Sequence, residues 1–202
     1  MAIFAIYQAL PSSWVPDRND QLIFGDIGFV FFANVFLNAL WLPIFKGNTP
    51  TRFILSAIDL SLVLCTCVYM MMKTSRADSL NLWEYISMQI GFSIYSGWVT
   101  AATILNICNY FKSIGYADPK IDEEKVTIIL LWIAALIYTT ATFREKNPWY
   151  GLVFVWVLFS IKSRACKDGS EVVHGGLKIL LRVYVMVLLA FTTYLALLAN
   201  GK

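Results

Sequence analysis

Long apolar runs separated by short polar breaks constrain this chain more than any other feature of its sequence. A helix needs about 20 apolar residues to cross a hydrocarbon core of about 30 Å, and several runs reach that length. The apolar runs cover residues 22–45, 53–72, 86–111, 126–143, 149–161 and 177–200. The run 149–161 has only 13 residues, so whether it crosses stays open. The pattern predicts an all-α polytopic transmembrane bundle of about six helices, of which five to six cross.

Composition supports this fold class and excludes others. Of the 202 residues 58% are hydrophobic and 14% are charged, whereas a soluble domain carries roughly 25% charged residues. The high content of apolar and aromatic side chains also excludes intrinsic disorder. The formal net charge of +3 comes from scattered charges with no basic face, so a nucleic-acid partner is not expected. The lipid bilayer is therefore the first expected partner.

The polar breaks are too short to hold a second folded domain, so residues 1–202 are expected to form a single transmembrane domain. Residues 1–21 read as a short half-helix and loop, either interfacial or buried, because their apolar stretch covers only about half of a bilayer core. This N-terminal stretch resembles neither a secretory signal nor a transit peptide. No disulfide is expected, since three of the four cysteines lie inside apolar runs.

Polar residues inside the spans are the first candidates for function, because lipid cannot satisfy them. Asp59 lies about a turn and a half into the second span, where it is either a proton or ligand contact or a carboxylate paired structurally with a neighbouring helix. In the third span a polar and small-residue face recurs at three- and four-residue spacing. It includes Gln89, Ser93, Gly97, Thr100, Ala101 and Thr103. Such a face favours close helix packing over a ligand-lined groove.

Catalytic constellations are missing from the sequence. His174 is the only histidine and is expected in a loop, which excludes bis-histidine haem ligation and a histidine-based triad within this chain. There is no phosphate-binding glycine loop, no CxxC and no HExxH. We therefore expect no enzyme activity, no metal site and no required cofactor.

Three stretches carry a family resemblance. They are FLNALWLPIF at 36–45, SAIDLSLVL at 56–64 and IYSGWVTAATILNICNY at 94–110. They resemble the tryptophan-rich sensory protein family, TspO/MBR, which includes the translocator protein. The resemblance implies a five-helix core that binds porphyrins, sterols or isoquinoline-type ligands. Carried over by motif, the ligand-facing residues would be Asn38, Trp41, Pro43, Asp59, Trp98 and Asn106.

The chain also departs from the family pattern. The stretch YQALPS at 7–12 also resembles a larger bacterial branch of the family. The family's first helix, most of its second helix and its pocket-closing loop should precede this stretch, yet only six residues stand before it. We therefore expect a divergent form with a TspO-like three-helix portion at 22–111, lacking N-terminal helices, and additional transmembrane helices at 126–200.

Two functions from different classes follow from this departure. The first is a non-catalytic accessory subunit of a larger membrane complex, such as a respiratory complex of the mitochondrial or another organellar inner membrane, with other membrane subunits as partners. The alternative is a membrane sensor or translocator that binds a porphyrin or other tetrapyrrole, or a sterol or related lipid.

Overall fold

A computed structural model describes residues 1–46, 49–115, 123–167 and 171–200, and within these ranges the chain is helical, with no strand. The predicted all-α membrane bundle is confirmed. Five helical stretches are long and apolar enough to cross a membrane: Gln21–Phe45, Pro50–Ser75, Leu82–Ser113, Val126–Arg144 and Gly175–Leu198. The predicted run at 149–161 lies within a 20-residue helix, Pro148–Lys167, that is not among these five. Lys162 and Arg164 lower the hydropathy of its last turns.

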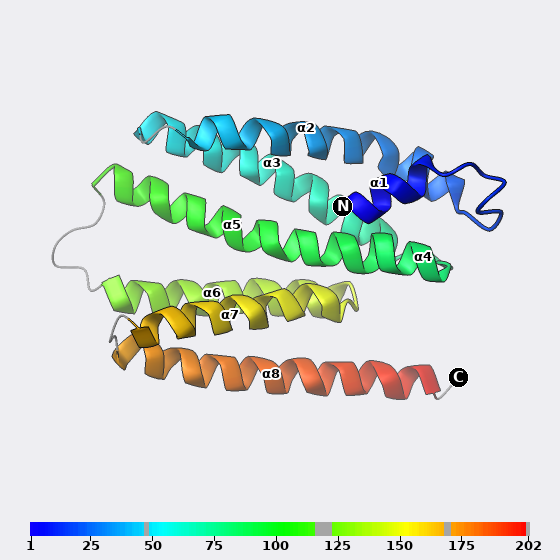
Figure 1. The fold of residues 1–202 in the computed structure, drawn as a ribbon. Helices are drawn as coiled ribbons and strands as arrows, with labels where there is room; N and C mark the ends of the chain where they lie inside the picture. The colour runs from blue at the N-terminus through cyan, green and yellow to red at the C-terminus, as the bar shows by residue number, and fades with distance from the viewer. Residues whose placement is uncertain (47–48, 116–122, 168–170, 201–202) are drawn as a thin grey trace. The chain divides into compact units, whose positions relative to one another are not determined.

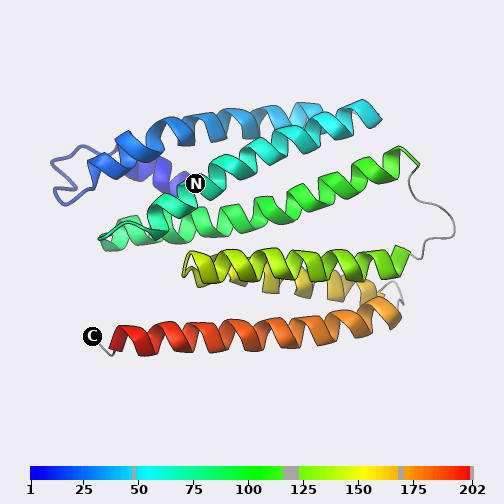
Figure 2. The ribbon, with the colours of Figure 1, turned by 180° about the vertical axis from the view of Figure 1, so that it is seen from behind.

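Two compact units divide the chain, Met1–Tyr116 and Ala117–Lys202. The helices of the first unit are α1 (Ala2–Ala9), η1 (Gln21–Ile27), α2 (Gly28–Phe45), α3 (Pro50–Ser75), α4 (Leu82–Glu84), η2 (Tyr85–Ile90) and α5 (Gly91–Ser113). The wider π-helical turns η1 and η2 run directly into α2 and α5, so each pair forms one continuous span. Within this unit α3 packs against both α2 and α5, and Figures 1 and 2 show the three helices side by side.

Local signals in the sequence set the helix ends of the first unit. Thr49 caps α3 by accepting a hydrogen bond from the Arg52 amide at 3.4 Å, and Pro50 occupies the first turn, where no amide donor is needed. Asn81 and Glu84 form a reciprocal capping box at the start of α4. At the end of α5, Gly115 takes a positive φ of 73°, a conformation that glycine adopts without steric cost.

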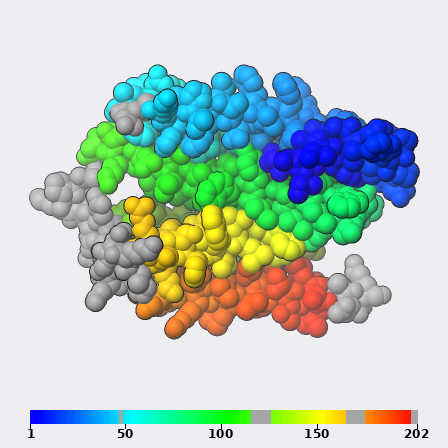
Figure 3. All heavy atoms as spheres, in the orientation of Figure 1, coloured from blue at the N-terminus to red at the C-terminus, as the bar shows by residue number. Residues whose placement is uncertain are grey.

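The N-terminal helix α1 is packed into the first unit on one side. Phe4 is fully buried and meets the rings of Phe31 and Phe92 edge to face, with centroids 4.8 Å and 5.0 Å away. Figure 3 shows this helix, in dark blue, lying against its own unit. Ile3 and Ile6 on the other side of α1 stay exposed. The residues 1–21 expected to form an interfacial half-helix and loop thus contribute to the core on one side of α1.

The second unit consists of α6 (Glu123–Arg144), α7 (Pro148–Lys167) and α8 (Glu171–Asn200), which pack on one another. Aromatic rings join the three helices. Phe154 of α7 stacks on Tyr138 of α6 at 4.6 Å and meets Tyr184 of α8 at 4.8 Å. Gly151 allows the helices to approach closely, because a Cβ there would lie 2.8 Å from Thr142 Oγ1. His174, expected in a loop, lies instead in α8, and its side chain is outside the described part of the chain.

Candidate functional site

The predicted polar and small-residue face of the third span begins at Gln89 in η2 and continues along α5. Ser93, Gly97, Thr100 and Thr103 are buried, while Gln89 and Ala101 are partly buried. Three hydrogen bonds join the polar side chains of this stretch to α3. The Gln89 amide donates to Ser75 Oγ at 3.2 Å, Thr103 donates to the Leu60 carbonyl at 3.5 Å, and Ser56 donates to Asn106 Oδ1 at 2.9 Å. These bonds satisfy polar groups that lipid could not.

A matching polar contact joins α2 to α3 and was not predicted from the sequence. Asn34 is fully buried, and its Nδ2 faces the Val63 carbonyl at 3.2 Å, Thr66 Oγ1 at 2.8 Å and Cys67 Sγ at 3.2 Å. The sequence did offer a signal, because Asn34 is a side-chain amide inside an otherwise apolar run. Such a residue is expected to face protein and not lipid.

The six residues expected to face a ligand are placed in different environments. Asp59 and Asn106 are buried and Trp41 is partly buried, whereas Asn38, Pro43 and Trp98 are exposed, Trp98 by 49%. Trp41 stacks on Phe45 at a centroid distance of 5.1 Å. The Pro43 carbonyl accepts a hydrogen bond from Arg52 Nη1 at 3.2 Å. The structure thus distributes these residues between the helix interfaces and the outer surface of the first unit.

Two of these six residues carry a buried side-chain atom without a hydrogen bond among the described residues, Asp59 Oδ2 and Trp41 Nε1. In the same unit Asn34 Oδ1, Gln89 Oε1 and Ser96 Oγ are also buried without one. Trp41 packs against the apolar cluster that contains Leu60, the residue after Asp59. A buried polar atom without a hydrogen bond is costly, so a polar ligand group could be accommodated beside Asp59 and Trp41.

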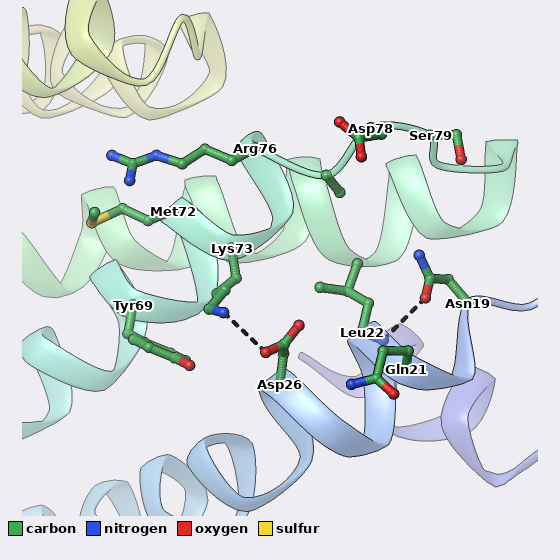
Figure 4. A pocket seen from close by; sticks show the side chains of 11 residues that line it. Asn19, Gln21, Leu22, Asp26, Tyr69, Met72, Lys73, Arg76, Asp78 and Ser79 are labelled. Atoms are coloured by element: carbon green, nitrogen blue, oxygen red, sulfur yellow. Dashed lines mark hydrogen bonds and ion pairs between the residues drawn. The ribbon is translucent and has the colours of Figure 1, made fainter.

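A cleft of about 660 Å³ lies elsewhere in the first unit, between the start of η1 and the end of α3. None of the six predicted ligand-facing residues lines it. In its wall the Lys73 ammonium donates to Asp26 Oδ1 at 2.9 Å, and the same ammonium lies 5.7 Å from the centre of the Tyr69 ring. Figure 4 shows Lys73 and Asp26 pointing toward one another, with Arg76 extending beside Met72. Sequence reasoning missed this cleft.

A buried carboxylate beside the cleft holds the N-terminal segment in place. Glu84 is only 1% exposed and accepts hydrogen bonds from the Asn19 amide at 2.6 Å, the Asn81 amide at 3.1 Å and the Tyr7 hydroxyl at 3.4 Å. Burial raises the pKa of Tyr7, a hydrogen bond from Asn81 opposes that shift, and the negative charge of Glu84 adds to it. This cluster therefore couples α1, the segment before η1 and α4.

Among the described residues, no group of three or more histidine, cysteine, aspartate or glutamate side chains could hold a metal ion. The first unit instead provides helix-to-helix hydrogen bonds, several buried polar atoms without a hydrogen bond among the described residues, and a charged cleft.

A family model described as TSPO-like protein matches residues 1–198. The match extends over the helices at 126–200 that the sequence suggested were additions to the family fold. No curated protein and no solved structure matches the chain. Because the family model covers nearly the whole sequence, the chain belongs to the family of TSPO-like proteins.

Proposed function

We propose that this TSPO-like membrane protein is a non-catalytic accessory subunit of a larger membrane assembly. The exposed amide of Asn38 carries the proposal. Asn38 lies seven residues before the end of the span Gln21–Phe45, roughly 10 Å along the helix from that end at 1.5 Å per residue. Lipid cannot hydrogen-bond an amide at that depth, so a protein surface is its natural neighbour.

Other features of the first unit support a scaffolding role. Gln89 of η2 and Thr103 and Asn106 of α5 are engaged in hydrogen bonds to α3. The Ser93 and Thr100 hydroxyls donate to carbonyls one turn earlier in their own span, so few of these polar groups remain to line a ligand groove. An organellar inner membrane, such as that of mitochondria, and a respiratory complex are the setting we propose. This part rests on the family resemblance alone.

Site-specific photocrosslinking in the native membrane tests the subunit proposal. A photoreactive amino acid at position 38 should crosslink to a different polypeptide in high yield. The matched control is position 36, because Phe36 is exposed on the same helix and two residues rotate the side chain to nearly the opposite face. Equal yields from positions 36 and 38, or crosslinks to lipid alone, would contradict the proposal.

The alternative is a tetrapyrrole- or sterol-binding sensor or translocator. The specific observation in its favour is that two of the residues carried over from the family motif, Asp59 and Trp41, each have a buried polar atom without a hydrogen bond among the described residues. Titration with protoporphyrin, followed by tryptophan quenching, tests it. Saturable quenching that is lost in Trp41→Phe supports ligand binding, whereas the absence of saturable quenching beyond that of the variant excludes tetrapyrrole binding.

A further inference from the structure

The cleft between η1 and α3 lies where two spans end. The α3 span ends at Ser75 and the span that begins with η1 starts at Gln21, so the cleft opens at the depth of lipid headgroups. Tyr69, Met72, Lys73 and Arg76 share one face of α3 and its cap, because they follow the three- and four-residue spacing of a helix. Along this face the lining changes from apolar on the bilayer side to cationic at the outer end.

The charges of the cleft are balanced rather than of one sign. Lys73 and Arg76 supply two positive groups, and Asp26 and Asp78 supply two negative groups. A purely anionic ligand would meet the two carboxylates, and a purely cationic ligand would meet the ammonium and guanidinium groups. A ligand with a phosphate at one end and a positive charge at the other matches both signs.

The lining also distinguishes between kinds of positive group. A quaternary ammonium is bound best by several aromatic faces, but among the described residues that line the cleft Tyr69 is the single aromatic one. The Lys73 ammonium already lies over that ring at 5.7 Å. A primary ammonium needs hydrogen-bond acceptors instead, and Asp78 and Ser79 line the same end of the cleft.

We propose that the cleft binds the phosphoethanolamine headgroup of a membrane lipid. Arg76 and Lys73 hold the lipid phosphate, and the Arg76 guanidinium does so through several N–H donors. Asp78 accepts a hydrogen bond from the ammonium group of the lipid. Leu22 and Met72 contact the start of the acyl chains. The volume of about 660 Å³ lies within the range of small-molecule sites, as a headgroup requires.

Native mass spectrometry of the delipidated full chain in detergent micelles tests the assignment. The probes are dioleoyl phosphatidylethanolamine, dioleoyl phosphatidylglycerol and free phosphoethanolamine. The wild-type chain should bind the ethanolamine lipid in preference to the glycerol lipid. Arg76→Gln should weaken its binding roughly fivefold, the effect of removing one cation near a phosphate. The matched control Lys46→Gln, an exposed cation at the opposite end of α2, should leave binding unchanged.

Asp78→Asn gives the sharpest readout. It should weaken binding of phosphatidylethanolamine and strengthen binding of phosphatidylglycerol, so that the preference of the chain is reversed. A merely structural role for Asp78 would weaken both lipids together. Asp17→Asn is the matched control, since Asp17 is exposed and does not line the cleft. Equal binding of the two lipids by the wild-type chain would overturn the proposal, even if a variant failed to fold. Displacement of the lipid by free phosphoethanolamine at the same concentration would assign the site to a soluble ligand and overturn the lipid assignment.

Discussion

Replacing Glu84 with alanine should release the N-terminal helix from the rest of its unit. The Glu84 carboxylate is buried and accepts hydrogen bonds from the backbone N–H groups of Asn19 and Asn81 at 2.6 Å and 3.1 Å. A hydrogen bond to a charged group contributes a net 1.5 to 3 kcal/mol, so loss of these two should cost about 3 kcal/mol at least. The Tyr7 hydroxyl keeps its hydrogen bond from Asn81 Nδ2 at 3.0 Å, which limits the further cost.

The assay is the free energy of unfolding of the purified protein, obtained by titration with sodium dodecyl sulfate and followed by tryptophan fluorescence. Glu84→Gln should be intermediate, because one carboxamide oxygen replaces two carboxylate oxygens and an amino group then faces the Asn81 amide. The control Asp17→Asn, an exposed carboxylate nearby in sequence, should change stability by less than about 0.5 kcal/mol. A Glu84→Ala variant as stable as this control would refute the reasoning that the carboxylate couples the three segments.

Three further predictions concern stability. Because burial raises the pKa of Tyr7 above its usual 10.0, the folded state holds the phenol proton more tightly than the unfolded chain. The contribution of Tyr7 to the free energy of unfolding should therefore be fully present below pH 10.0 and should be lost as the pH rises further. Melting measured across this pH range should show a smaller loss of stability in Tyr7→Phe. Asn106→Leu should lower the free energy of unfolding by about 0.6 to 1.7 kcal/mol, as measured for single hydrogen bonds between membrane helices, and an unchanged value would mean that the bond from Ser56 contributes nothing. Gly151→Ala should cost about 1 to 3 kcal/mol, because the new Cβ meets side-chain atoms at 2.8 to 3.2 Å. Gly175→Ala, with open space around the Cβ, should instead be neutral or stabilising in the same titration.

The sequence was sufficient for features set by local pattern. The spans follow from the length of each apolar run, because hydrophobic length is a property of consecutive residues. The three- and four-residue spacing of residues such as Ser93 and Thr100 already predicted one polar face on the third span. In the structure both residues are buried in the unit where α5 packs against α3.

Features that depend on distant residues could not be predicted. Glu84 meets Asn19 and Tyr7, which are 65 and 77 residues away in the chain, and no local pattern encodes such a meeting. The cleft has the same origin, because Asp26 and Lys73 belong to different spans and are brought together by the register of the two helices. Register depends on packing, which sequence periodicity alone does not determine.

The residues carried over from the family motif illustrate another limit. A motif indicates which residue types are present but not which way each helix is rotated in this chain. Asn38 and Trp98 are exposed while Asn106 is buried, although all three were assigned to one ligand-facing set. The exposed members of this set suggest where a partner protein would bind.

Purification of the intact particle from its native membrane in mild detergent, followed by mass spectrometry, tests the subunit proposal most directly. We predict a particle in which this chain is present in fixed stoichiometry with at least one other membrane polypeptide. A small particle containing only this chain, carrying a porphyrin or a sterol, would contradict it and assign Asp59 and Trp41 to a ligand site.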